Sequence, residues 1–274
     1  MEKILAIIAS FLLTAGMVSA RSGAGGNDGA GKAGNDGTIT LRVMSMNIRM
    51  GGEYAGYESG PFSELIKEYD PDIVCCQEVD YKTARNGGRD WLNSVAMETG
   101  MFPFYASRPY STGNFGVAIL SKYPFFKAEK IMSDIEGAGE LRPTGWVYIS
   151  LPDGNTVRVA STHLALESSE ITIRHIADLN TKIFAEDEET PTLLIGDFNA
   201  DEGSDPIVYA TRKRWQDIGS GTGDTIPSDG PTRRLDYVMG NPRGSWSSTS
   251  YEVIARPDLS DHCFIVADVV FTAE

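Results

Sequence analysis

Short apolar runs of strand length recur through this sequence, and several of them end abruptly in a polar side chain. The runs that we predict to be strands are residues 39–46, 72–78, 115–120, 145–149, 156–161, 192–195, 234–239 and 263–271. Pro152-Asp153-Gly154-Asn155 predicts a hairpin turn between the fourth and fifth runs. A chain with so many short strands is expected to bury them in sheets.

Three segments between these runs have the apolar spacing of helices. They are residues 63–69, preceded by Pro61; residues 91–99, which Gly100 is placed to cap; and the amphipathic residues 169–185. Hairpins mixed with helical crossovers predict an α/β fold in which helices cover two packed sheets.

The composition indicates a globular, acidic protein. Hydrophobic residues make up 41% of the 274 residues and charged residues 23%, which is enough apolar surface for a substantial core. Lys and Arg number 24 and Asp and Glu 38, so the net charge is −14. Because duplex nucleic acid is bound mainly through basic side chains, this charge disfavours tight duplex binding. Three cysteines exclude a disulfide scaffold.

The N-terminus has the pattern of an export signal. Residues 1–20 combine a basic residue, a short apolar stretch and a small-residue end, which predicts a signal peptide. The alternative, a membrane anchor, needs about 20 apolar residues, more than this stretch provides. Residues 21–37 are rich in Gly, Ala, Asn and Asp and predict a flexible linker. We therefore expect an exported domain over residues 38–274, periplasmic or extracellular, with no stable membrane anchor.

Polar side chains at the ends of the predicted strands are the candidates for a functional site. Ligands of α/β proteins bind where strand ends and loops meet, so these side chains are expected to converge. Alone, each has an ordinary explanation: a Glu at a strand exit is solvated, a single His is structural, and an Asp or Asn forms or caps a turn. The candidates are Asn47, Glu78, His163, Asp197, Asn199, Asp261 and His262.

The order and local sequence of these segments favour a shared function. The chain contains Met46-Asn47, Gln77-Glu78, Ser161-Thr162-His163-Leu164, Gly196-Asp197-Phe198-Asn199-Ala200, Arg234-Leu235-Asp236-Tyr237-Val238 and Ser260-Asp261-His262. This series resembles the endonuclease/exonuclease/phosphatase superfamily, which contains DNase I-like nucleases, neutral sphingomyelinases and inositol polyphosphate 5-phosphatases. The resemblance covers nearly all of residues 38–274. It implies a four-layer α/β sandwich and divalent-metal-dependent hydrolysis of phosphoesters.

A metal site fits these residue types. The oxygens of a phosphoester are anionic, so a catalyst needs a hard cation on them, and Mg²⁺ prefers oxygen ligands. Glu78 and Asn47 are a minimal set of that kind. The resemblance implies that Glu78 is the principal ligand, Asn47 its companion and Asp261 a further contact. It also implies Mg²⁺ as the ion, with Mn²⁺ or another divalent cation as alternatives.

The resemblance also assigns roles in the attack of water. It implies that Asp197 orients or deprotonates the water and that Asn199 holds a phosphoryl oxygen. His262 lies against the phosphate, and Asp236 bonds its second ring nitrogen, which fixes the tautomer and raises the pKa of the imidazole. His163 donates to a phosphoryl oxygen as charge builds in the transition state. Which of His262 and Asp197 is the base stays open.

Four further residues are weaker candidates, each with a structural alternative. Arg142 is a possible phosphate contact or an exposed structural arginine. Tyr105 lies where family members often place a tyrosine directed at the phosphate, although no motif secures the match. Asn114 fits a turn better than the site. Arg174 points back toward His163 or pairs with a neighbouring acid.

The substrate is less constrained than the chemistry, because loops outside these motifs select it. Export, the acidic charge and the absence of an obvious insertion favour a phosphodiesterase or phosphatase acting on a small or lipid-derived phosphoester. Alternatives are a secreted DNase I-like nuclease and an inactive binding protein on the same fold. The last would be expected to lack a ligand or histidine, and every motif residue is present. We expect a monomer.

The cysteines give a direct test of the strand predictions. If Cys75 and Cys76 are successive residues of one buried strand and Cys263 belongs to another, all three stay free thiols. Mass spectrometry after alkylation under denaturing, non-reducing conditions should then find three modified cysteines. A bridge between Cys75 and Cys76 would contradict the strand.

Overall fold

The computed structural model describes residues 38–272, apart from residues 153, 186, 220 and 242–244. The predicted signal peptide (1–20) and linker (21–37) lie outside the described residues and stay predictions. Within the described residues, no helix is both long and apolar enough to cross a membrane.

The strands form two six-stranded mixed sheets. The first has the order β11 (Ser245–Ile254), β12 (Phe264–Thr272), β1 (Thr38–Asn47), β2 (Ile73–Tyr81), β4 (Gly113–Ser121) and β3 (Phe102–Tyr110). The second has the order β5 (Phe125–Ser133), β6 (Arg142–Ser150), β7 (Thr156–His163), β8 (Thr192–Asp197), β10 (Asp236–Gly240) and β9 (Gln216–Asp217). β1 pairs with β2 in parallel and β7 pairs with β8 in parallel, so these strands end at a common edge.

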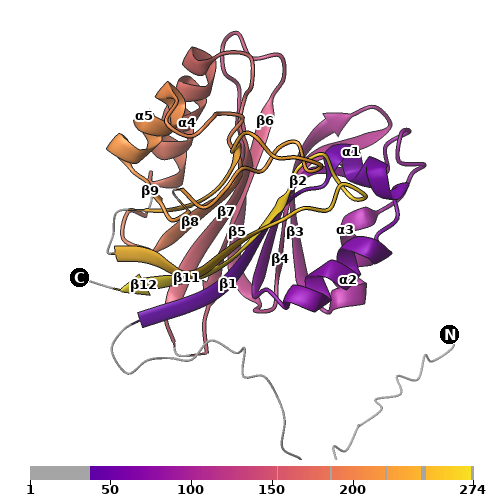
Figure 1. The fold of residues 1–274 in the computed structure, drawn as a ribbon, viewed down its shortest axis with the longest axis horizontal. Helices are drawn as coiled ribbons and strands as arrows, with labels where there is room; N and C mark the ends of the chain where they lie inside the picture. The colour runs from indigo at the N-terminus through magenta and orange to yellow at the C-terminus, as the bar shows by residue number, and fades with distance from the viewer. Residues whose placement is uncertain (1–37, 153, 186, 220, 242–244, 273–274) are drawn as a thin grey trace, which may run out of the picture. The chain divides into compact units, whose positions relative to one another are not determined.

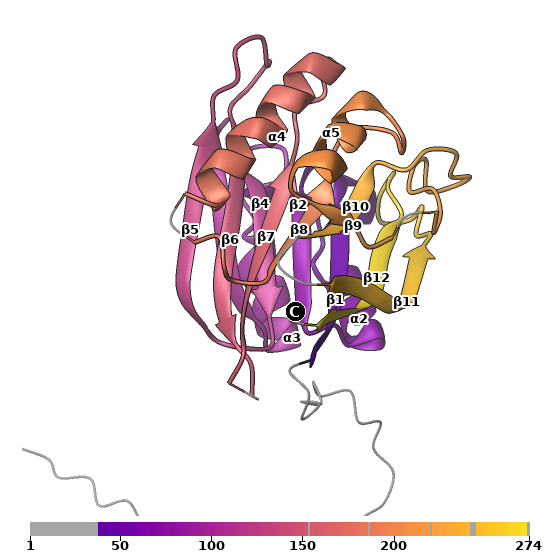
Figure 2. The ribbon, with the colours of Figure 1, turned by 90° about the vertical axis from the view of Figure 1, so that its left-hand side faces the viewer.

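Helices cover the outer face of each sheet, which confirms the predicted four-layer sandwich (Figures 1 and 2). α2 (Gly60–Tyr69) and α3 (Trp91–Thr99) pack on the first sheet, and α4 (Ser169–Ile183) and α5 (Asp205–Lys213) pack on the second. Gly100 caps α3 in the left-handed conformation, as predicted. The short α1 (Arg49–Gly52) and the 3-10 helix η1 (Glu53–Ala55) follow β1 directly.

Alternating side chains explain why β2 begins with four apolar residues, Ile73–Cys76. Val74 and Cys76 point toward the helices, whereas Ile73 and Cys75 point into the layer between the sheets. A strand buried on both faces needs apolar side chains at every position. The two neighbouring cysteines therefore face opposite layers, and all three cysteines are free and buried.

The structure shifts several predicted boundaries. α2 begins at Gly60, α4 ends at Ile183, and β10 begins at Asp236 rather than at residue 234. The interior strands were all predicted, whereas the edge strands β3, β5, β9 and β11 were not. Edge strands are half solvated, so their sequences lack the apolar runs on which the prediction depends.

Glu78 lies within β2, not at its exit as predicted. The pairing of β2 with β4 shifts register between Cys76 and Val79, which marks a β-bulge. Glu78 sits in this bulge with a positive φ of 60°. Bulges redirect a side chain near active sites, and this one turns the carboxylate of Glu78 toward Asn47 and Met50, whose nitrogens donate to it.

Gly145 of β6 gives a test of how closely the sheets pack. A Cβ on Gly145 would lie 2.6 Å from the Cβ of Ala106 and 2.9 Å from Cε1 of Phe104, both in β3. We expect Gly145→Ala to lower the free energy of unfolding by about 1–3 kcal/mol, because the added methyl overpacks the layer. Urea unfolding measures this loss. Gly60→Ala, which meets open space, is the control, and an equal loss in both variants would contradict the account.

Candidate active site

The layer between the sheets becomes polar toward the edge where β1, β7 and β8 end. Ser45 Oγ donates to Gln77 Oε1 at 3.4 Å, and Gln77 Nε2 donates across the layer to Ser161 Oγ at 3.3 Å. All three side chains are buried. Gly196 leaves room for this contact, because a Cβ there would lie 3.1 Å from Gln77 Nε2. The polar layer therefore ends next to Asp197.

Asp197 is the centre of the site. Its Oδ2 accepts a hydrogen bond of 3.1 Å from Asn47 Nδ2, and its Oδ1 accepts one of 2.8 Å from the backbone nitrogen of Asn199. The Nε2 atoms of His163 and His262 lie 3.4 and 3.8 Å from Oδ2. The structure therefore brings four of the predicted residues, from both sheets, around the carboxylate of Asp197, which is 1% exposed.

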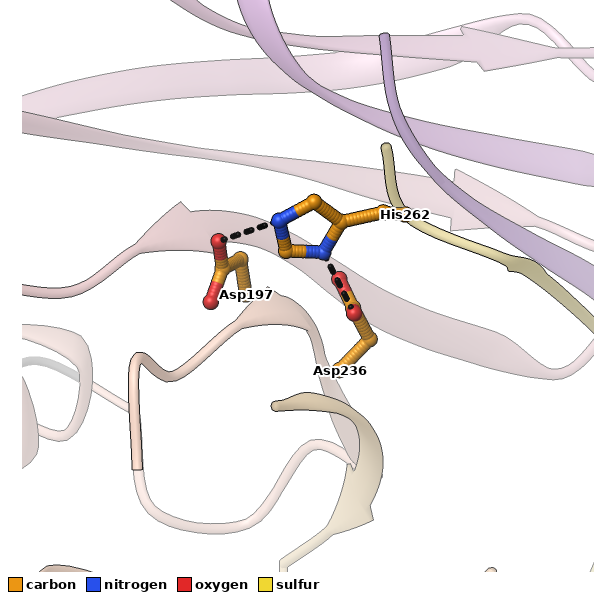
Figure 3. Close-up of side chains that lie close together, drawn as sticks. All are labelled: Asp197, Asp236 and His262. Atoms are coloured by element: carbon orange, nitrogen blue, oxygen red, sulfur yellow. Dashed lines mark hydrogen bonds and ion pairs between the residues drawn. The ribbon is translucent and has the colours of Figure 1, made fainter. Parts of the chain in front are cut away.

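Asp236 holds His262 in place, as Figure 3 shows. The Nδ1 atom of His262 lies 2.8 Å from Asp236 Oδ2, so its Nε2 faces Asp197. Asp236 stands directly opposite Asp197 in the antiparallel pair of β10 and β8. Ser260 fixes the segment that carries His262, since its Oγ accepts from the backbone nitrogen of His262 and donates to the carbonyl oxygen of Asn47.

Burial and neighbouring charges separate the pKa values of these groups. Burial, reinforced by the carboxylate of Asp236, raises the pKa of Asp197 to about 7. Burial alone would lower the pKa of His262, but the carboxylates of Asp236 and Asp197 outweigh it and raise that pKa to about 10. Burial and the charge of Arg142 hold the pKa of His163 well below its usual value. At neutral pH the site thus holds one protonated and one neutral imidazole.

Glu78 and Asn47 present hard oxygen atoms of the kind that Mg²⁺ takes. Glu78 Oε1 accepts from Asn47 Nδ2 at 3.3 Å, and Oε2 accepts from the backbone nitrogen of Met50 at 2.8 Å. Within the described residues, no basic side chain forms an ion pair with Glu78. A partly buried carboxylate without such a partner fits a cation site. The carboxylate of Asp261, in contrast, is paired with Arg49 at 3.0 Å.

A second group of possible ligand atoms consists of Asp197, Asp236 and His262, which lie within 4.8 Å of one another. In this group the Nδ1 atom of His262 is already bonded to Asp236, and both carboxylates are buried. The arrangement is that of a carboxylate-oriented imidazole, which is chemically able to hold and move a proton. The oxygen set of Glu78 and Asn47 fits Mg²⁺ better.

The sequence matches the model of the Endonuclease/Exonuclease/phosphatase family over residues 44–262. The chain belongs to this family. Members of the family hydrolyse phosphoesters and generally depend on a divalent metal. No curated protein sequence matches the chain.

Several solved structures share the fold of this chain. A conserved protein of unknown function from Enterococcus faecalis V583 is 20% identical, with a TM-score of 0.72 over 85% of this chain and 100% of its own. The Bacteroides thetaiotaomicron mannosyl-6-phosphatase Bt3783 is 16% identical, with a TM-score of 0.69 over 84% of this chain and 100% of its own. The human Nocturnin catalytic domain, solved with a bound sulfate anion, is 19% identical, with a TM-score of 0.69 over 85% of this chain and 94% of its own.

Among the weaker candidates, Arg142 lies at the site and Tyr105 does not. Arg142 is 5% exposed, so it is not an exposed structural arginine, and it lines a cleft together with Glu78 and His163. Tyr105 instead donates its hydroxyl to the carbonyl oxygen of Val79 at 2.8 Å and packs against the core under the helices. The structure therefore does not bring Tyr105 to this site, because its side chain leaves the sheet on the helix-covered face.

Asn199, Asn114 and Arg174 have structural contacts. Asn199 donates its side-chain amide to the carbonyl oxygen of Leu164 at 2.9 Å, which ties the loop after β8 to the loop after β7. Arg174 lies 3.8 Å from Glu170, one turn back on α4, and this matches the alternative of a pair with a neighbouring acid. Asn114 lies in β4 and lines a cavity on the helix-covered side with Tyr105.

Sequence reasoning missed most of the residues that line this cleft. The missed residues are Met50, Arg85, Arg108, Tyr110, Phe115, Glu140 and Leu166. Most of these residues lie in loops or on the edge strand β3, which has no apolar run to predict it. The only available signal was the presence of arginines beside aromatic residues in an acidic chain.

The metal assignment has a direct test in Glu78→Gln. We expect this change to weaken Mg²⁺ binding by about tenfold or more, because it removes the charge of the principal ligand. Isothermal titration calorimetry with MgCl₂ measures this affinity. The melting temperature of the metal-free variant should stay close to that of the unchanged protein. A large loss of melting temperature with unchanged Mg²⁺ affinity would assign Glu78 a structural function instead.

Proposed function

We propose that this protein is an exported, Mg²⁺-dependent hydrolase of a small or lipid-derived phosphoester. The observation that carries the proposal is the convergence of Asn47, His163 and His262 on the buried carboxylate of Asp197. An anionic ester, a cation and an attacking water all need fixed partners at one point, and this cluster provides them. Export rests on the sequence pattern of residues 1–20.

Glu78 and Asn47 would hold the cation, with Asp261 able to join them if it leaves Arg49. The bound Mg²⁺ would supply charge stabilisation at a phosphoryl oxygen. Glu78 is placed for this by the bulge in β2, and Asn47 by the end of β1. The ligands therefore come from the first sheet and face Asp197 and His163, which end two strands of the second sheet.

The remaining residues would handle the water and the phosphoryl group. Asp197, with a pKa near neutrality, orients the attacking water and accepts its proton. His262, kept protonated by Asp236, places a positive charge against the phosphate. His163 donates to a phosphoryl oxygen, where negative charge builds in the transition state. Asn199 holds the turn that carries Asp197 through its backbone nitrogen, and its side chain would help to hold a phosphoryl oxygen.

Two alternatives are weaker. A secreted DNase I-like nuclease would have to bind a polyanion with a protein whose net charge is −14. An inactive binding protein would not need the complete set of motif residues that this chain keeps. The similarity of fold to a mannosyl-6-phosphatase is compatible with a small substrate. We expect the protein to act as a monomer.

Hydrolysis of a chromogenic phosphodiester and the matching monoester, with Mg²⁺ or with EDTA, tests this proposal. We expect turnover that needs Mg²⁺ and that falls by about 100-fold or more in His262→Ala, because the change removes the positive charge placed against the phosphate and a preorganised group of this kind contributes at least this much. The ratio of diester to monoester turnover distinguishes a phosphodiesterase from a phosphatase.

Asp178→Asn serves as the matched control, since Asp178 lies on α4 and bonds Ser133 and Lys182 away from the site. It should keep full activity. Turnover that resists EDTA, or that survives in His262→Ala, would contradict the proposed chemistry.

A further inference from the structure

Three arginines gather in one cleft beside the catalytic cluster. Arg85, Arg108 and Arg142 line the cleft together with Tyr110 and Phe115. The protein as a whole carries a net charge of −14, so this local excess of positive charge runs against its composition. Burial and the like charges of Arg142 and Arg85 lower the pKa of Arg108. An anion bound here would relieve that repulsion.

Arg85 and Arg108 are held in fixed positions. The guanidinium of Arg85 binds both oxygens of the buried Asp80, at 2.6 and 2.9 Å. It also lies 4.7 Å from the ring centre of Tyr110 and 5.0 Å from that of Phe115. Arg108 packs on the same two rings at 5.4 and 5.5 Å. Rigid guanidinium groups lose little entropy when they bind a carboxylate or phosphate.

Arg142 is the most buried of the three arginines and is not fully satisfied. It is 5% exposed, and its Nε has no hydrogen-bond partner among the described residues. Its Nη2 lies 3.1 Å from Glu140, and the other carboxylate oxygen of Glu140 pairs with Arg108. One carboxylate of the protein therefore bridges two arginines at the wall of the site.

The loop that carries Glu140 is held in place by a hydrogen bond to Glu167. Glu167 accepts hydrogen bonds from the backbone nitrogens of Gly139, at 2.6 Å, and Leu166, at 3.1 Å. This contact joins the loop between β5 and β6 to the loop after His163. Glu140 itself stays partly exposed, with a side chain that is 32% accessible. Its carboxylate can therefore swing into solvent while the loop stays in place.

We propose that the substrate carries a second anionic group, which binds between Arg108 and Arg142 in place of the Glu140 carboxylate. This rests on the proposed function, because Arg142 and His163 line the same small cavity and the second group must lie next to the scissile phosphate. The second group is a carboxylate or a phosphate, since both match the forked geometry of arginine. The substrate class is thus a phosphoester with an acidic neighbour.

A matched pair of substrates tests this specificity. 2-Phosphoglycerate and glycerol 2-phosphate differ only by a carboxylate in place of a hydroxymethyl group, and glycerol 1,2-bisphosphate carries a second phosphate in place of that carboxylate. We expect the kcat/KM ratio of 2-phosphoglycerate to glycerol 2-phosphate to exceed one and to fall about tenfold in Arg108→Gln. Glu140→Gln should raise the ratio, because it removes the competing carboxylate. Comparing kcat/KM for the substrate with a second phosphate and for 2-phosphoglycerate shows which anionic group the subsite prefers.

Arg89→Gln is the matched control. Arg89 lies in the same loop as Arg85 but pairs with Glu58 at 2.8 Å, away from the cleft. It should leave the ratio unchanged. A kcat/KM ratio of one in the unchanged protein would overturn the subsite. A ratio that falls in both Arg108→Gln and Glu140→Gln would also overturn it, because a merely structural ion pair predicts that both changes lower the ratio.

Binding measurements separate the subsite from the proposed catalysis. Calorimetry with phosphonoacetate and ethylphosphonate, in the presence of Mg²⁺, compares a ligand with a carboxylate and one without it, and neither is hydrolysed. Preference for phosphonoacetate that is lost in Arg108→Gln supports the subsite even if no substrate turns over. Turnover without any preference for the acidic ligand leaves the hydrolase and overturns the subsite.

Discussion

The hydrogen bond between Asn47 and Asp197 joins the two sheets at the edge where the site forms. Asn47 ends β1 and Asp197 ends β8, and each strand has a parallel neighbour that ends at the same edge. The parallel pairings therefore carry the polar residues of both sheets to one place. The remaining groups reach this contact through three local features. These are the bulge at Glu78, the turn at Asn199 and the segment that carries His262.

Burial makes this contact chemically useful as well as structural. In water, a carboxylate would keep the ordinary pKa of an aspartate. Asp197 lies instead at the end of a layer between the sheets that is lined by buried apolar side chains. Because little solvent reaches the cluster, each nearby charge has a stronger electrostatic effect on the other groups. Asp236 and the two histidines therefore set the protonation of the cluster. The same fold serves many phosphoesterases, and the selection of a substrate falls to the surrounding loops. In this chain those loops place arginines and aromatic rings on one wall of the cleft.

The sequence was most informative where burial is complete. Every interior strand was predicted, because the apolar runs that mark these strands are local features. The edge strands were missed for a physical reason: β3 contains two prolines and β11 is rich in serine, so neither has the uninterrupted apolar run by which the interior strands were predicted. Glu78 was misplaced because a bulge depends on the partner strand. Tyr105 was predicted to lie near the site because of its position in the chain. Only the tertiary structure shows which face of β3 its side chain occupies.

The three histidines allow the charge arrangement at Asp197 to be measured directly. Nitrogen-detected NMR titration of the ring nitrogens, in EDTA, follows each of them separately. The account predicts that His262 stays protonated through neutral pH, with a pKa of about 10, while the buried His163 and His175 stay neutral and His175 titrates only near a pKa of about 4. In Asp236→Asn the pKa of His262 should fall. Three histidines that titrate together near the ordinary value would contradict a buried cluster organised around Asp197.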